Sequence, residues 1–243
     1  MKKILSLLLA LGFFVISCSP GQKETKFAIA TSADNPPFEF VENGKIVGFD
    51  IDLAAEIAKE LKMELEITNL DFHSLIMSLL TDKVDVAIAA LTPSPTRLAH
   101  ADFSKPYTET EMAVLFRDDM KIDSEEDLKS KVLGAQFGTT WAEYAEKMAK
   151  ASIGGSVRTL PDNLTLVKEL LSKNVDILVM EKVQAMKFAS KHGKLSFFVL
   201  PNTKSQFAIA LAKNSKLTPR INEIITKLDK NGFLKRLKNK WLQ

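Results

Sequence analysis

Short apolar runs alternate with amphipathic stretches along most of this chain, and that alternation limits the folds open to it more than any other feature. The run VDVAIAAL at 84–91 is apolar at nearly every position, as strands buried on both faces of a parallel sheet are. The stretch at 50–61 instead places Leu53, Ile57 and Leu61 on one helical face. Strands and helices in βαβα order predict a parallel sheet covered by helices.

The pattern occurs twice along the chain. The first unit predicts strands at 26–31, 64–70 and 84–91 and helices at 50–61 and 72–80, with Asp50 as the N-cap of the first helix. The second unit predicts strands at 131–137, 156–160 and 175–180 and helices at 140–150 and 164–173. The apolar segments 111–117 and 205–212 separate these units and are the candidates for strands that cross between them. A helical tail with a break at Asn231 and Gly232 follows.

The fold class that follows is α/β, with two Rossmann-like lobes joined by two crossing strands. Lobe 1 is expected to comprise 26–108 and 206–243, and lobe 2 to comprise 109–205. A chain of 243 residues is long enough for two lobes of about 100 residues each. Clefts between such lobes are where small ligands bind.

The chain contains one cysteine, Cys18, at the end of an N-terminal apolar run. Two lysines precede that run, which spans 4–16 and is too short to cross a bilayer as a helix. Residues 1–17 therefore have the features of a signal peptide. The sequence VISC resembles the lipobox of bacterial lipoproteins, which implies that Cys18 becomes an acylated first residue and that 18–25 form a polar tether. An ordinary secretory signal with an incidental cysteine is the alternative.

Three segments of the first unit resemble a known family: NPPFEFVENGKIVGFDIDLAAEIAKEL at 35–61, DFHSLIMSLLTDKVDVAIAALTPSPTR at 71–97 and DFSKPY at 102–107. They are similar to the first lobe of the extracytoplasmic amino-acid-binding proteins that feed ABC importers, the polar amino acid family 3 type. The second unit is similar more loosely, through FGTT, VDILVME and NGFLKRLKNKW. The resemblance implies a periplasmic binding protein type II fold, a free amino acid as ligand, an importer permease as partner, and a monomer outside the cytoplasm.

A free amino acid held in a closed cleft needs a partner for each of its two charges, because an unpaired buried ion is strongly destabilising. In the family, the arginine that matches Arg97 binds the carboxylate, and the loop that matches Ala90, Leu91 and Thr92 supplies backbone and hydroxyl contacts. A planar guanidinium can bond both carboxylate oxygens at once. This chain has Thr96 where the family more often has an acid, and a solvated surface charge is the alternative for Arg97.

The second unit also offers partners for the ligand charges. Gly138, Thr139 and Thr140 lead into a predicted helix, whose N-terminus favours an anion and makes both threonines candidates for a second carboxylate contact. A glycine turn that only caps the helix is the alternative. For the ammonium, the family uses an aspartate at the end of a buried strand. Glu181 holds that place here, with the same charge and one more methylene.

Selectivity is expected from the residues around the ligand side chain. Phe72 and Phe38 match family positions near the ligand, with core packing as an equal alternative for Phe38. Four uncharged residues complete the expected wall: Ser32, Asn35, Gln136 and Met180. Some relatives carry an acid in place of the serine and an aromatic residue in place of the asparagine. The wall therefore predicts a neutral amino acid as ligand, with Asp34 as the one acid near enough to change that.

Other features exclude several classes of function. Lys and Arg number 33 against 30 Asp and Glu, a balance that argues against a nucleic-acid partner. The histidines lack ligand spacing, so no metal is expected, and the absence of nucleotide-binding motifs predicts no cofactor and assigns ATP hydrolysis to a partner. Two alternatives stay open. One is a cyclohexadienyl dehydratase-like enzyme on the same scaffold, with Glu181 as a desolvated acid, and the other is a surface lipoprotein with a vestigial cleft.

Overall fold

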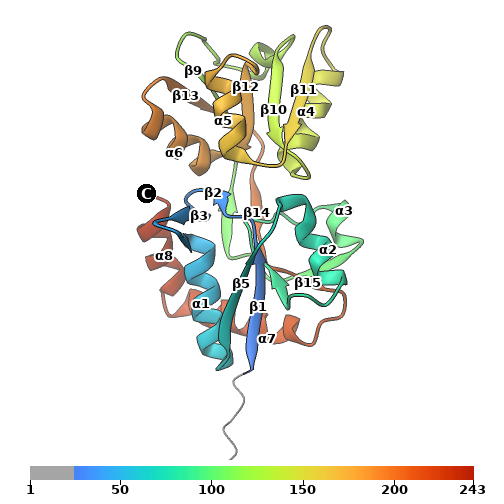
Figure 1. Ribbon diagram of the computed structural model, residues 1–243, viewed down its shortest axis with the longest axis vertical. Coiled ribbons are helices and arrows are strands. Elements are labelled where there is room, and N and C mark those ends of the chain that lie inside the picture. Colours follow the sequence, from blue (N-terminus) through green and yellow to red (C-terminus); the bar gives the residue numbers. More distant parts are fainter. Residues whose placement is uncertain (1–24) are drawn as a thin grey trace, which may run out of the picture.

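The structure, a computed structural model, describes residues 25–243 and has two α/β lobes, drawn one above the other in Figure 1. This confirms the predicted fold class. The predicted signal peptide and Cys18 lie outside the described residues, as does nearly all of the tether. Within the described range, no helix combines the length and the apolar character needed to cross a membrane.

Lobe 1 is built on a sheet in which β15 runs antiparallel to its neighbours, while β5, β1 and β6 are parallel. The strand order is β5 (Glu64–Asn69), β1 (Lys26–Thr31), β6 (Val86–Ala87), β15 (Ala210–Ala212) and β7 (Ala101–Phe103). The helices are α1 (Phe49–Leu61), α2 (Leu75–Leu80), α3 (Pro95–Leu98), α7 (Leu217–Lys230) and α8 (Phe233–Trp241), with a 3-10 turn at Phe72–Ser74 before α2. A small antiparallel sheet contacts α1 and contains β2 (Asp34–Asn35), β3 (Glu39–Glu42) and β4 (Lys45–Val47). The predicted helical tail is confirmed, and both of its helices pack on α1.

Lobe 2 repeats the arrangement with a second five-stranded sheet (Figure 1). Its strand order is β11 (Ser156–Leu160), β10 (Val132–Gln136), β12 (Ile177–Glu181), β9 (Met112–Arg117) and β13 (Leu195–Val199). The helices are α4 (Thr140–Lys150), α5 (Asn163–Leu171) and α6 (Lys182–His192), with a 3-10 turn at Glu125–Leu128. β10, α4, β11, α5 and β12 match the predicted strands and helices of the second unit within two residues at each end, whereas α6 and β13 were not predicted.

The strands that link the lobes differ from the predicted ones. The prediction that 111–117 crosses is wrong: β9 lies inside the lobe 2 sheet, paired with β12 and β13. The short strands β8 (Thr108–Thr110) and β14 (Ser205–Phe207) pair antiparallel with each other in a separate two-stranded sheet. The segment 205–212 divides at this point, because its second half becomes β15 of lobe 1. The proposed lobe boundaries fall within β8 and β14.

Two local predictions in lobe 1 are also corrected. Asp50 is not the N-cap of α1; Gly48 is, and Asp50 is fully buried in the first turn. A side chain at Gly48 would meet the carbonyl oxygen of Phe38 at 2.2 Å, and its φ of +135° suits glycine, so the helix begins there. The expected strand at 84–91 pairs only at Val86 and Ala87, because Ala90 turns the chain with a φ of +46°.

Candidate functional site

The predicted ligand residues of lobe 1 follow the carboxyl ends of β1 and β6, which face lobe 2, where ligands of open α/β sheets bind. Arg97 lies on the short helix α3. Pro95 occupies the first turn of that helix, and the Ser94 hydroxyl accepts a hydrogen bond from the Arg97 backbone N–H at 3.4 Å. The turn directs the arginine toward the lobe junction.

Arg97 is a buried cation, with only 9% of its surface exposed. Its guanidinium donates to the carbonyl oxygens of Thr92 at 2.7 Å and, across the junction, of Gly138 at 3.0 Å. It also lies over the Phe72 ring, 5.1 Å from the centroid. Burial lowers the pKa of Arg97 to about 10, with Glu143 opposing the shift, so the group stays charged at neutral pH. No salt bridge to Arg97 forms within residues 25–243.

Several polar atoms along the same edge of lobe 1 are buried without a hydrogen-bond partner in the described part of the chain. They are the hydroxyl oxygens of Thr31 and Thr92 and the side-chain oxygen of Asn35. Buried polar atoms without partners are rare in folded proteins, and a ligand is one ordinary reason for them. Thr92 lies next to Arg97, since its carbonyl oxygen accepts from the guanidinium.

On the lobe 2 side, the Gly138–Thr140 turn caps α4. The Thr139 hydroxyl accepts from the N–H of Ala142 at 3.1 Å and donates to the carbonyl of Gln136 at 2.6 Å, so it is already occupied by helix capping. Thr140 begins the helix and is half-buried. Gly138 has a φ of +79°, and a side chain there would meet the β-carbon of His73 in lobe 1 at 2.9 Å. Glycine therefore permits the close approach of the two lobes.

Glu181 ends β12 and is 2% exposed. Its carboxylate caps α6 by accepting from the N–H of Gln184 at 2.8 Å, and it accepts from the Thr110 hydroxyl on β8 at 3.0 Å. Burial raises the pKa of Glu181 to about 7, against the lowering effect of those hydrogen bonds. The side chain also borders a cavity of about 350 Å³ next to the crossing strands, together with Thr110 and Lys204.

Asp34 bridges the lobes, a role that no local sequence signal indicates. Its Oδ2 accepts from Gln136 Nε2 at 3.0 Å and from the N–H of Asn163 at 2.7 Å, and its Oδ1 accepts from the Ser32 hydroxyl at 3.3 Å. The Asn163 side chain in turn donates to Gln136 Oε1 at 2.9 Å. Burial raises the pKa of Asp34 to about 6. Together with the bond from Arg97 to Gly138, these contacts hold the lobes against each other.

Three of the predicted ligand contacts have side chains that pack in the cores. Phe38 is fully buried against Phe207 and Phe49, at centroid distances of 5.2 Å and 6.0 Å. Leu91 and Met180 are each 1% exposed, in the cores of lobe 1 and lobe 2. Their side chains offer no surface to a ligand, which corrects the expectation that Phe38 and Met180 line its side-chain pocket. Leu91 can still contribute through its position in the loop.

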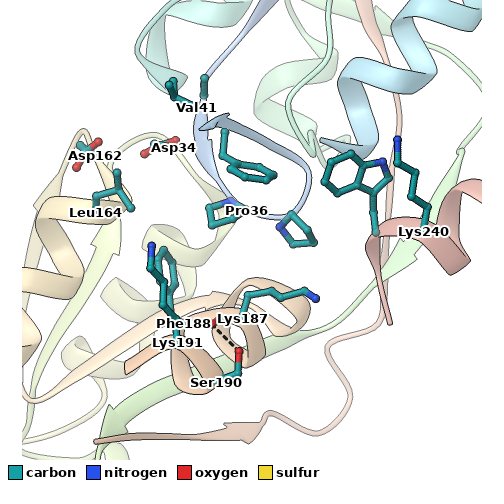
Figure 2. Close-up of a pocket in the computed structure, with 14 residues that line it drawn as sticks. Asp34, Pro36, Val41, Asp162, Leu164, Lys187, Phe188, Ser190, Lys191 and Lys240 are labelled. Atoms are coloured by element: carbon teal, nitrogen blue, oxygen red, sulfur yellow. Dashed lines mark hydrogen bonds between the residues drawn. The ribbon is translucent and has the colours of Figure 1, made fainter. Parts of the chain in front are cut away.

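A separate cavity of about 600 Å³ opens between the lobes beside Asp34 (Figure 2). Lobe 1 lines it with Pro36, Phe40 and Trp241, and lobe 2 lines it with Leu164 and Phe188. Three lysines lie at its border: Lys187, Lys191 and Lys240. Arg97, Thr139 and Glu181 do not line this cavity, so it is distinct from the predicted amino-acid site. No group of His, Cys, Asp and Glu among residues 25–243 is arranged to hold a metal ion.

Comparison with known proteins places this geometry in a family. Residues 27–243 match the family model of bacterial extracellular solute-binding proteins, family 3. The arginine-binding extracellular protein ArtP of Bacillus subtilis is 34% identical, over 99% of this chain and 98% of that protein. Solved structures of an ancestral arginine-binding protein, bound to arginine and bound to glutamine, both superpose with a TM-score of 0.84 at 33% identity. Each superposition covers 90% of this chain. It covers 99% of the arginine-bound chain and 98% of the glutamine-bound chain.

The family model covers nearly all of the described residues, and ArtP matches 99% of this chain. Family members are extracytoplasmic proteins that bind amino acids for ABC transporters. This chain therefore belongs to family 3 of the bacterial extracellular solute-binding proteins.

Proposed function

We propose that this protein holds a free amino acid between its lobes and presents it to the permease of an ABC importer, as a monomer. The observation that carries the proposal is the buried Arg97 cation at the lobe junction, which has no carboxylate partner in the described chain. A ligand carboxylate would supply one, through the two-pronged geometry that guanidinium groups favour. A ligand that contacts both lobes stabilises the closed state, which the permease can then distinguish from the open one.

The experiment that tests this proposal is a thermal-shift screen of the purified mature chain against the twenty amino acids. A ligand that binds only the folded state raises the melting temperature. At least one amino acid should do so in a concentration-dependent manner. A flat response across the panel would reject the proposal and leave the vestigial-cleft alternative.

We propose Glu181 as the partner of the ligand ammonium, across the junction from Arg97. Its burial and its position at the end of β12 support that role. The hydrogen bonds from Gln184 and Thr110 hold the side chain in place, and above its pKa of about 7 the carboxylate is charged and can pair with a cation. The remaining proposed contacts are Asn35, Phe72 and the loop at 90–92 in lobe 1, and Gln136 and the turn at 138–140 in lobe 2.

We further propose a neutral amino acid as the ligand. The Asp34 carboxylate contacts the proposed side-chain wall through Gln136, and it is already engaged by donors from lobe 2. Ser32, Asn35 and Gln136 carry no charge that could pair with an ionic side chain. The rival proposal is a cationic amino acid, because ArtP and the ancestral protein are named for arginine; the ancestral protein was also solved with glutamine.

Competition calorimetry separates these two ligand classes. We expect glutamine or another neutral amino acid to bind more tightly than arginine or lysine, because no acid in the wall is free to pair with a buried cation. If arginine or lysine binds at least about tenfold more tightly than every neutral amino acid, the neutral proposal fails. In that event an Asp34→Asn variant would reveal whether Asp34 gives up its lobe 2 donors to bind the ligand cation.

We propose that Cys18 carries the lipid that anchors the protein to a bacterial membrane. The support comes from the sequence VISC after a short apolar leader. The wild-type protein should fractionate with membranes and incorporate labelled fatty acid, whereas Cys18→Ala should do neither. Ser19→Ala, which leaves the cysteine in place, is the matched control. Incorporation of label into Cys18→Ala would remove the anchor from Cys18.

A further inference from the structure

Two carboxyl groups lie in contact inside lobe 1, beneath the proposed site. Glu39 on β3 and Asp50 on α1 are each 0% exposed, and the Asp50 N–H donates to the carbonyl oxygen of Phe38, the residue before Glu39, at 2.9 Å. Glu39 Oε2 and Asp50 Oδ1 are both buried and receive no hydrogen bond from residues 25–243. A carboxylate cannot donate to a carboxylate, and two buried like charges in contact repel strongly. One proton between the two oxygens satisfies both.

The other oxygens of this pair reach the edge of the proposed site. Glu39 Oε1 accepts from the Asn35 side-chain amide at 2.8 Å. Asp50 Oδ2 accepts from the Ala90 N–H at 2.7 Å and from the Tyr107 hydroxyl at 2.9 Å. Ala90 has a φ of +46°, a conformation that residues other than glycine rarely adopt and that surrounding contacts must maintain. The hydrogen bond from the Ala90 N–H to the Asp50 carboxylate is such a contact.

The hydrogen-bond pattern decides which acid holds the proton. Asp50 accepts from Ala90 and Tyr107 and, with the shared proton on Glu39, donates to no group, which suits an ionised carboxylate. Glu39 accepts from Asn35 and must donate to Asp50, which suits a neutral acid. Burial, and then the charge of Asp50, raise the pKa of Glu39 well above its ordinary value, and Asp34 adds to the effect. Burial raises the pKa of Asp50 to about 6. Burial also raises the pKa of the Tyr107 hydroxyl, which therefore stays protonated and can donate to Asp50.

We propose that Glu39 and Asp50 form a proton-sharing pair that positions Asn35 and Ala90 for ligand binding, with the proton on Glu39. The positioning step rests on the proposed function, whereas the shared proton does not. Both residues act through others and are positioning residues, since neither is exposed to the junction.

The shared proton is tested without ligand. Carbon-detected NMR of protein labelled at the glutamate side-chain carboxyl carbons should show one neutral glutamic acid at pH 7, and Glu39→Gln should remove that signal. Glu42→Gln, on the exposed end of the same strand, should leave the signal in place. If every glutamate in the wild type except Glu181 is ionised at pH 7, the proton is not on Glu39 and the proposal fails. Comparison with Glu181→Gln assigns the Glu181 signal.

The pH dependence of unfolding gives an independent reading. The pKa of Glu39 is raised in the folded protein above its ordinary value of 4.5. The wild type therefore loses stability as the pH rises from 4.5 through the pKa that Glu39 has in the folded state. Glu39→Gln has no proton to lose there, so its unfolding free energy relative to the wild type should increase over that range. A constant difference between the two proteins would overturn the assignment of the proton to Glu39.

The positioning role is tested by the affinity for whichever amino acid the thermal-shift screen identifies. Glu39→Gln should bind within about threefold of the wild type, because its amide can donate to Asp50 while its oxygen accepts from Asn35. Asp50→Asn should bind at least about tenfold more weakly, because an amide offers one acceptor oxygen to three donors. If Asp50→Asn does not fold, Glu39→Ala serves, and wild-type affinity in either variant would refute the positioning role. If the wild type itself binds no amino acid, the proposed function fails while NMR still decides the shared proton.

Discussion

Alanine in place of Arg97 is expected to weaken binding of the cognate amino acid at least about tenfold, since truncating one partner of a buried charge pair typically costs about 2 to 5 kcal/mol. The ligand carboxylate would then be buried without a counter-charge. Arg97 also connects the lobes through its bond to the Gly138 carbonyl, so its loss removes one contact of the closed state. Isothermal calorimetry on folded protein measures the effect.

Matched variants separate charge from geometry at this position. Arg97→Lys keeps the cation but loses the planar guanidinium that reaches both Thr92 and Gly138. Its affinity for the ligand should lie between those of the wild type and of Arg97→Ala. Arg220→Ala is the control, because Arg220 is exposed on α7 and pairs only with nearby Glu223. Wild-type affinity in Arg97→Ala would exclude Arg97 from the ligand site and remove the main support for the proposed function.

The secondary structure could be predicted from the sequence where periodicity alone decides it. The apolar stripe at Leu53 and Ile57 and the break at Asn231 and Gly232 were sufficient to predict α1, α7 and α8. The crossing strands could not be assigned in the same way. The run at 112–116 is apolar on both faces, which indicates that the strand is buried but not where it lies. The position of β9 between β12 and β13 in lobe 2 buries it just as well.

The contacts that define the site are long-range, and local patterns contain no information about them. Asp34 meets Gln136 and Asn163 from 102 and 129 residues away. Asp50 lies in the first turn of α1, where an aspartate is ordinarily solvent-exposed, yet it is buried because Ala90 and Tyr107 supply donors from distant segments. Phe38 is similar to a ligand-contacting family position, but its side chain completes the core between Phe49 and Phe207.

Glu181→Gln is expected to bind the amino acid at least about tenfold more weakly at pH 8, because the ligand ammonium loses its counter-charge. Glutamine is preferred to alanine here. Its side-chain oxygen can still accept from the N–H of Gln184 and cap α6, so the helix start is retained. Glu109→Gln is the matched control, since Glu109 is exposed and borders the same small cavity.

The wild-type affinity should also depend on pH in a defined direction. Burial raises the pKa of Glu181 to about 7, so at lower pH most unliganded protein carries a proton that must leave before the carboxylate can pair with an ammonium. Binding therefore releases a proton, and affinity should fall as pH drops below about 7, by up to about tenfold per unit. Asp34 has a pKa raised to about 6 and can also contribute to the pH dependence. Repeating the pH series in Asp34→Asn measures how much of the change in affinity comes from Asp34. A pH profile in Glu181→Gln as steep as that of the wild type would show that another group releases the proton, and the ammonium partner would have to be sought elsewhere in the junction.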